Sequence, residues 1–268
     1  MTTHSTDRKS KDRQYETGEQ EELENEDQEL SFLEHLVELR SRLLKACVAV
    51  LAVLIVLLPF SRKLYALLAA PLTSVLPEGS SMIAIDVASP FLTPFKLSLL
   101  LALLLSIPVV LYQLWAFVAP ALYRKEKRLA RPLLYSAVVL FYTGCAFAYF
   151  VVFPLVFGFF TRVAPEGVTV MTDISKYLDF VTTLFLAFGL TFEVPIATII
   201  LVATGIITVE KLAKMRGYVL VGAFAMGMFL TPPDIISQTL LAVPMWLLFE
   251  VGLLMSRILL PHRVKEKD

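Results

Sequence analysis

The chain has 268 residues, of which 57% are hydrophobic and 18% are charged, and its mean hydropathy is +0.71. Soluble domains are about 45–50% apolar and about 25% charged, so a soluble fold of this size could not bury so much apolar surface. The same figures exclude the disordered, fibrous and disulfide-rich classes. We predict an all-α integral membrane protein.

The formal net charge of zero conceals an acidic N-terminal segment. Residues 1–30 hold four basic and ten acidic residues, and their only aromatic residue is Tyr15. Such a segment cannot bury enough apolar surface to become ordered, so we predict a disordered cytoplasmic tail and assign it no function. We expect no secretory signal in it, because it contains no apolar run before a cleavage site. A membrane domain is expected at 31–260 and a short cytoplasmic tail at 261–268.

Six apolar segments approach the roughly 20 residues that a membrane-spanning helix requires. They lie at about 43–60, 95–118, 133–160, 180–204, 218–230 and 235–255. The fifth segment would be about 20 Å long as a helix, against a hydrocarbon core of about 30 Å. The sixth begins with the polar residues Ser237 and Gln238, so its apolar part is also short. We therefore expect the bilayer to be thinned beside this pair.

Prolines predict where the chain turns and bends. The last two segments are separated by Thr231, Pro232, Pro233 and Asp234, and the double proline forces a tight reversal. Asp234 can cap the helix that follows it. Four spans contain an interior proline: Pro108, Pro154, Pro195 and Pro244. Bends at these prolines predict a curved, cup-like wall, although such kinks are common in membrane helices. The connections at about 61–94 and 161–179 are expected to carry short helices.

The basic residues predict how the spans are oriented. Fifteen of them flank the first span, join spans two to three and four to five, or follow the sixth: Arg40, Arg42, Lys45, Arg124, Lys125, Lys127, Arg128, Arg131, Lys211, Lys214, Arg216, Arg257, Arg263, Lys265 and Lys267. Five lie on the opposite side: Arg62, Lys63, Lys96, Arg162 and Lys176. The positive-inside rule then places both termini in the cytoplasm.

Two carboxylates lie near the expected cytoplasmic surface. Ser31 and Glu34 form a capping box that starts a helix, and Glu38 follows one turn later. Glu38 could form an i,i+4 ion pair with Arg42, or it could accept a cationic ligand. Glu126 is surrounded by cations in the connection between the second and third spans. It could balance local charge, or it could bind a guanidinium group.

Glu193 lies in the middle of the fourth span. A charge at that depth costs at least about 2.5–3.5 kcal/mol on insertion scales, so a functional role is expected. The alternative is a hydrogen bond to the hydroxyl group of Thr143, Thr182 or Thr183. Glu250, near the inner end of the sixth span, could reach the surface or pair with Arg257.

No metal-ligand spacing, phosphate-binding loop or nucleophile motif occurs in the sequence. Cys47 and Cys145 lie in apolar stretches and are expected to be small core residues. We therefore expect no catalysis, no cofactor, no metal and no nucleic acid partner.

Several stretches, in this order, resemble the TatC family, the large membrane component of twin-arginine protein translocation. They are His35–Arg40, Asp86–Pro90, Tyr112–Tyr123 leading into Glu126, Phe141–Pro154, Phe192–Pro195 and Leu230–Gln238. The similarity covers about residues 31–257.

The resemblance implies six curved helices in a bacterial cytoplasmic membrane, with both termini inside the cell. It implies that Glu38 and Glu126, with Arg40 in the same motif, receive the paired arginines of signal peptides. The resemblance also places Glu193 on the concave face of the curved arrangement of helices. It also implies that single-span TatA and TatB partners dock around Met228, Thr231 and Gln238, and that several copies assemble for export of folded cargo driven by the proton-motive force.

A proton-coupled small-molecule transporter that uses Glu193 is the alternative function. The lack of a visible internal repeat weighs against it, because many secondary transporters are built from repeated halves.

Overall fold

The computed structural model describes residues 36–73, 82–123, 130–163, 172–230 and 235–260. The chain divides into two units, Met1–Cys47 and Val48–Asp268. The described residues of the first unit belong to one helix, which covers residues 36–57 and continues into the second unit. The expected tails at 1–30 and 261–268 lie outside the described residues.

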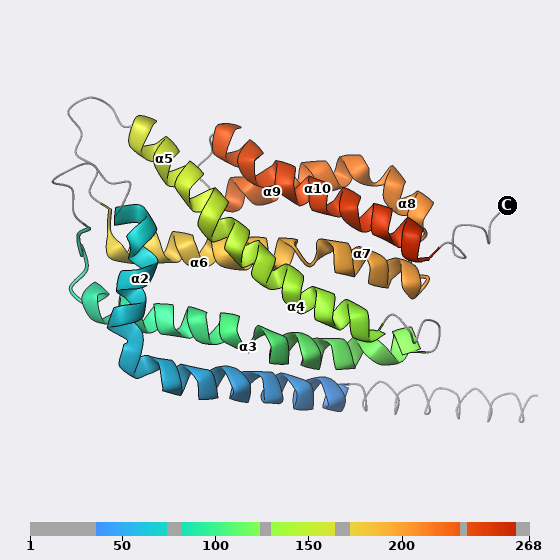
Figure 1. Ribbon diagram of the computed structural model, residues 1–268, viewed down its shortest axis with the longest axis horizontal. Coiled ribbons are helices and arrows are strands. Elements are labelled where there is room, and N and C mark those ends of the chain that lie inside the picture. The colour runs from blue at the N-terminus through green and yellow to red at the C-terminus, as the bar shows by residue number, and fades with distance from the viewer. Residues whose placement is uncertain (1–35, 74–81, 124–129, 164–171, 231–234, 261–268) are drawn as a thin grey trace, which may run out of the picture. The chain divides into compact units, whose positions relative to one another are not determined.

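Nearly all of the described chain is helical, as the composition predicts. After helix 36–57 the elements are η1 (Leu58–Phe60), α2 (Ser61–Thr73), α3 (Ser89–Tyr123), α4 (Ala130–Phe147), η2 (Ala148–Val152), α5 (Phe153–Val163), α6 (Ile174–Thr191), α7 (Val194–Ala203), α8 (Val209–Lys214), α9 (Arg216–Leu230) and α10 (Ile235–Leu259). Figure 1 shows α4 and α5 following one another diagonally across α6.

Five helical stretches in the described part of the chain are long and apolar enough to cross a bilayer. They are Leu36–Leu68, Ser89–Phe117, Arg131–Phe159, Ile174–Ala203 and Gln238–Leu259. A sixth apolar helix, Arg216–Phe229, is shorter and corresponds to the expected fifth span. The prediction of a multi-pass helical membrane protein is confirmed.

The expected bends at interior prolines differ from site to site. The helix around Pro154 contains the π-helical turn η2, because a proline has no N–H group for the regular helical hydrogen bond. Pro195 stands at the start of α7, so the fourth expected span is divided into α6 and α7. By contrast, α3 and α10 run without a break past Pro108 and Pro244.

The prediction of short helices in the long connections is confirmed for the first connection by α2, which contains the apolar run at residues 63–70. Residues 164–171 of the second connection lie outside the described residues. The described residues contain one extended pairing, the parallel bridge between Ile83 and Asp173. It joins the two connections, because Ile83 N–H donates to Thr172 O and Ile174 N–H donates to Ile83 O.

Three buried apolar clusters lie among the described residues of the second unit, and two of them are large. The first is rich in aromatic rings from α4, α5 and α6, among them Phe141, Phe153 and Phe188, which are all almost fully buried. The second joins α7, α8 and α10. Cys145 is buried in the first cluster as expected, but Cys47 is exposed, so its assignment to a core was wrong. An apolar side chain exposed on a membrane helix meets lipid, where burial in protein is not required.

Candidate functional site

The first turns of helix 36–57 carry Glu38, Arg40 and Arg42. The carboxylate oxygen Oε1 of Glu38 accepts a hydrogen bond from Arg42 Nε at 3.0 Å, and Arg42 Nη2 contacts the same oxygen. The side chains of this ion pair are half-buried, whereas Arg40 is exposed. The expected i,i+4 ion pair is therefore confirmed.

Glu193 lies in the break between α6 and α7. Phe192 and Glu193 form a turn, in which Glu193 N–H donates to Leu190 O, and α7 begins beside Pro195. Glu193 is therefore the acidic residue at the turn between α6 and α7. Sequence analysis located this residue in mid-span and expected a bend at Pro195, which this turn confirms.

The expected hydrogen bond of Glu193 to a threonine is not formed by its oxygen Oε1. That oxygen is buried and has no hydrogen-bond partner among the described residues. The hydroxyl groups of Thr143 and Thr183 instead donate to their own helices, at Val139 O and Asp179 O, both at 2.8 Å. A threonine in a helix can donate its hydroxyl hydrogen to the backbone carbonyl one turn earlier. This carbonyl competes with a more distant carboxylate as the acceptor.

Two glycines allow neighbouring helices to approach closely on either side of this break. A Cβ atom at Gly144 of α4 would lie 2.5 Å from Phe188 O and 2.9 Å from the ring of Phe192. A Cβ atom at Gly252 of α10 would lie 2.8 Å from the Cα atom of Pro195. Small residues permit such backbone approach in membrane proteins. Glu193 is thus held at a junction at which α4 and α10 pack tightly on α6 and α7.

Glu250 forms an ion pair with a residue that sequence analysis did not consider as its partner. Its carboxylate binds Arg216 of α9, with 2.7 Å between Arg216 Nε and Oε1 and 2.9 Å between Nη2 and Oε2. Arg257, the partner expected from the sequence, is exposed. The packing of α9 against α10 brings together two residues that are 34 positions apart.

The expected docking residues are only partly described. Met228 is 53% exposed near the end of α9, and Gln238 Nε2 of α10 donates to Phe224 O at 2.8 Å. The side chain of Gln238 therefore links α10 to α9 by a hydrogen bond. Thr231, Pro232, Pro233 and Asp234 lie outside the described residues, as does Glu126.

Asp173 is a polar anchor that sequence analysis missed. Its carboxylate caps α6 by accepting from the N–H groups of Ser175 and Lys176, and it also accepts from Ile85 N–H at 2.9 Å. The pKa of Asp173 is held below its ordinary value, chiefly by the hydrogen bond from Ile85. Asp173 directly precedes an apolar span, and aspartate is a preferred N-cap residue, so its capping role could have been predicted from the sequence.

Within the described ranges, no group of three or more His, Cys, Asp or Glu residues could hold a metal ion. The carboxylates of Glu38, Glu193 and Glu250 lie on the helix at 36–57, at the turn between α6 and α7, and between the packed helices α9 and α10.

Comparison with known proteins identifies the fold and its relatives. Residues 34–244 match the family described as Sec-independent protein translocase protein (TatC). The chain is 61% identical to the TatC protein of Azotobacter chroococcum, across 84% of this chain and 89% of that protein. It is 59% identical to TatC of Escherichia coli strain K12, across 83% and 86% of the two chains. A crystal structure of the twin-arginine translocase receptor TatC matches with a TM-score of 0.74 at 37% identity, over 84% of this chain and 98% of that one.

Proposed function

The chain belongs to the TatC family and is the receptor component of the twin-arginine translocase, and from this premise we propose that Glu38 and Glu126 bind the paired arginines of a signal peptide. It is a multi-pass membrane protein of the transport machinery and not an enzyme. This identity replaces the alternative of a small-molecule transporter. Family membership implies the translocase complex and signal-peptide binding; the assignment to these residues is ours.

The ion pair between Glu38 and Arg42 is the observation that carries the proposal. A half-exposed i,i+4 pair contributes only about 0.3–0.5 kcal/mol, so an incoming arginine can replace Arg42 at little cost. Guanidinium binds carboxylate through two parallel hydrogen bonds, which lysine cannot reproduce. Arg40, exposed on the same turn, would contact carbonyl groups of the bound peptide.

We place both termini in the cytoplasm of a bacterial cell, which puts Glu38 and Glu126 on the side where precursors are made. The excess of basic residues on that side supports this orientation. An even number of spans is needed for it, so α9 must cross the membrane as a sixth span. At 15 residues α9 is about 22 Å long, which requires local thinning of the bilayer. The breaks at η2 and before α7 support a curved wall of helices.

We further propose that single-span TatA and TatB partners dock beside α9 and α10, at Met228, Thr231 and Gln238. The exposure of Met228 supports this assignment. Glu193 would meet a polar group of a partner helix at the break before α7. In this scheme several copies of the receptor assemble, and folded cargo is exported with the proton-motive force.

Photo-crosslinking in membrane vesicles tests the binding site. A photoreactive residue replaces Lys125, beside Glu126, and a signal peptide with two arginines is compared with the same peptide carrying two lysines. We expect strong crosslinking of the arginine peptide and at least tenfold less of the lysine peptide, because charge-assisted bidentate bonds contribute about 1.5–3 kcal/mol each.

Substitutions then assign the effect to the two carboxylates. Glu38→Gln and Glu126→Gln should each reduce crosslinking of the arginine peptide. The matched control is Glu210→Gln, which removes an exposed carboxylate from the start of α8. Equal crosslinking of both peptides, or an equal loss in the control, would contradict the proposal and leave only general electrostatic attraction.

A further inference from the structure

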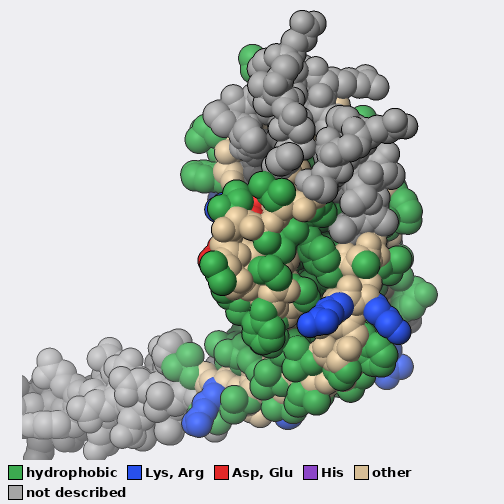
Figure 2. Space-filling model, turned by 90° about the vertical axis from the view of Figure 1, so that its left-hand side faces the viewer, with side chains coloured by type: hydrophobic (Ala, Val, Ile, Leu, Met, Phe, Trp, Pro, Cys, Tyr) green, Lys and Arg blue, Asp and Glu red, His purple; other side chains and the backbone are tan. Residues whose placement is uncertain are grey.

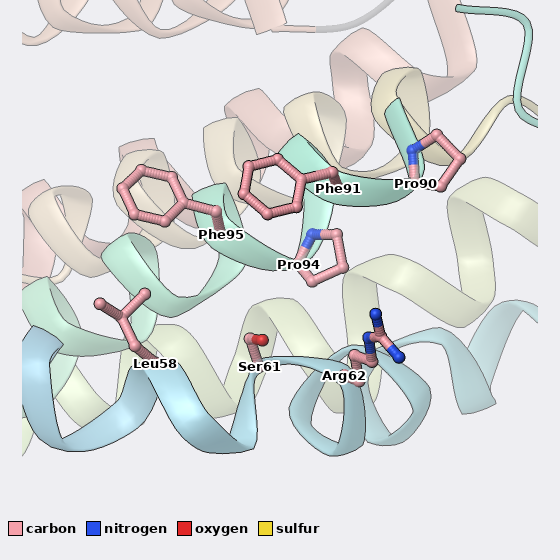
Figure 3. Close-up of a pocket in the computed structure, with 7 residues that line it drawn as sticks. All are labelled: Leu58, Ser61, Arg62, Pro90, Phe91, Pro94 and Phe95. Atoms are coloured by element: carbon pink, nitrogen blue, oxygen red, sulfur yellow. The ribbon is translucent and has the colours of Figure 1, made fainter. Parts of the chain in front are cut away.

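A groove lies beside the C-terminal end of the first span, whereas Glu38 lies near its N-terminal end. It has a volume of about 590 Å³ and is lined by Leu58, Ser61, Arg62, Pro90, Phe91, Pro94 and Phe95. Figure 3 shows Arg62 projecting from α2 toward the first turns of α3, which carry both phenylalanines. One wall is therefore aromatic and apolar, and the other carries a guanidinium group.

The spacing of charged residues along the first span indicates that the groove lies at the depth of the lipid headgroups. Between Lys45 and Arg62 the chain has no charged residue, and this stretch is about 24 Å long as a helix. A bilayer has a hydrocarbon core of about 30 Å, and basic side chains extend to reach its surface. This spacing predicts that Arg62 lies at the boundary between acyl chains and headgroups, where aromatic side chains also gather.

Both phenylalanines of the groove are exposed in the part of the chain that the structure describes. Phe91 is 77% exposed and Phe95 is 41% exposed. Among the described residues no carboxylate pairs with Arg62, whereas the nearby Lys96 is paired with Asp179 at 3.2 Å. Figure 2 shows basic side chains set among hydrophobic ones on this side of the molecule. An unpaired cation above an apolar wall is complementary to a molecule with an anionic head and an apolar tail.

We propose that this groove binds one glycerophospholipid of the surrounding leaflet, with its phosphate diester on Arg62 and an acyl chain along Phe91, Phe95 and Leu58. The planar guanidinium group donates two parallel hydrogen bonds to phosphate oxygens. The ring faces and Leu58 cover the acyl chain where it leaves the headgroup. The lipid would bridge η1 and α2 to the start of α3.

Native mass spectrometry of the full-length protein in a nonionic detergent tests this site. The probe is phosphatidylglycerol, and the variants are Arg62→Gln and the double variant Phe91→Ala/Phe95→Ala. The matched control is Lys63→Gln, which removes the adjacent exposed cation that does not line the groove. We expect both groove variants to bind one lipid fewer, with about a fivefold loss in affinity for Arg62→Gln, and the control to behave as the unmodified protein.

Two further ligands separate the headgroup from the tail and from free anions. Diacylglycerol, which has no phosphate, should bind equally to the unmodified protein and to Arg62→Gln. Inorganic phosphate should not displace phosphatidylglycerol. The proposal is overturned if phosphatidylglycerol binds equally to Arg62→Gln, if Lys63→Gln loses as much, or if inorganic phosphate alone competes for the site.

Discussion

The hydroxyl group of Tyr142 donates a hydrogen bond to the carbonyl oxygen of Leu104, at a distance of 3.0 Å. Leu104 lies four residues before Pro108 in α3, so its carbonyl is the one that the missing proline N–H group cannot serve. In a bilayer no water replaces that donor, and a neighbouring helix must do so. Tyr142 of α4 therefore explains why α3 continues without a break past Pro108.

We expect Tyr142→Phe to lower the free energy of unfolding by about 1 kcal/mol, because it leaves Leu104 O without this donor. In a Pro108→Ala background, the restored N–H group serves that carbonyl, and the cost of Tyr142→Phe should fall close to zero. A double-mutant cycle of unfolding in mixed micelles measures the difference. Tyr135→Phe, at a 74% exposed tyrosine of the same helix, is the control. An equal cost of Tyr142→Phe in both backgrounds would refute the explanation.

Gly252→Ala should destabilise the protein by about 1–3 kcal/mol, because the new methyl group would meet the backbone of α7 at 2.8 Å. Gly189→Ala should have a similar effect, since its Cβ would lie 2.6 Å from the ring of Phe141. Gly222→Ala in α9 is the control, because no atom lies within 4 Å of its added methyl group. Thermal unfolding in detergent compares the three, and an equally unstable Gly222→Ala would show that the loss does not come from helix approach.

The depressed pKa of Asp173 predicts a pH dependence. Its folded-state pKa lies below its ordinary value of 3.8, so the ionised carboxylate contributes stability above that value. This contribution is lost as the pH falls through the lower, folded-state pKa. We expect the melting temperature to fall more steeply with acid below pH 4 in the unmodified protein than in Asp173→Asn. Melting curves recorded from pH 7 to pH 3 measure this, and parallel profiles would contradict it.

Charge exchange tests the pairing of α9 with α10. Glu250→Gln should cost about 0.5–1 kcal/mol, because it leaves Arg216 unpaired at a half-exposed position. The double exchange Arg216→Glu/Glu250→Arg should recover part of the loss, whereas Arg257→Gln should have no effect. Unfolding in mixed micelles provides the measurement. A loss for Arg257→Gln as large as that for Glu250→Gln would restore the pairing expected from the sequence.

The residues that sequence analysis placed correctly depend on local patterns. Apolar length located the five long helical stretches and the shorter α9, and i,i+4 spacing was enough to predict the contact between Glu38 and Arg42. The bend expected at Pro195 is confirmed by the two-residue turn at Phe192 and Glu193, where both residues keep a right-handed helical backbone.

Pairs between distant segments could not be predicted in the same way. Asp173 and Ile85 are 88 residues apart, and Glu250 and Arg216 are 34 apart. Arg216 and Arg257 are both basic residues that the sequence places on the cytoplasmic side of the membrane. Charge alone therefore does not show which of them pairs with Glu250. The crossing of α9 and α10 decides between them, and no periodicity in one helix reports on the angle at which it crosses another.

Glu193 should show a conflict between stability and function. Its oxygen Oε1 is buried without a partner among the described residues, which destabilises a folded protein by about 1–3 kcal/mol. We therefore expect Glu193→Leu to keep or raise the melting temperature of the isolated receptor, while export of a twin-arginine substrate is lost. A residue retained for folding would behave in the opposite way. Glu193→Gln, which keeps a hydrogen-bonding group of the same size, should retain part of the export activity. A melting temperature that drops sharply in Glu193→Leu would assign the carboxylate a structural role, and unchanged export would remove it from the proposed contact with a partner helix.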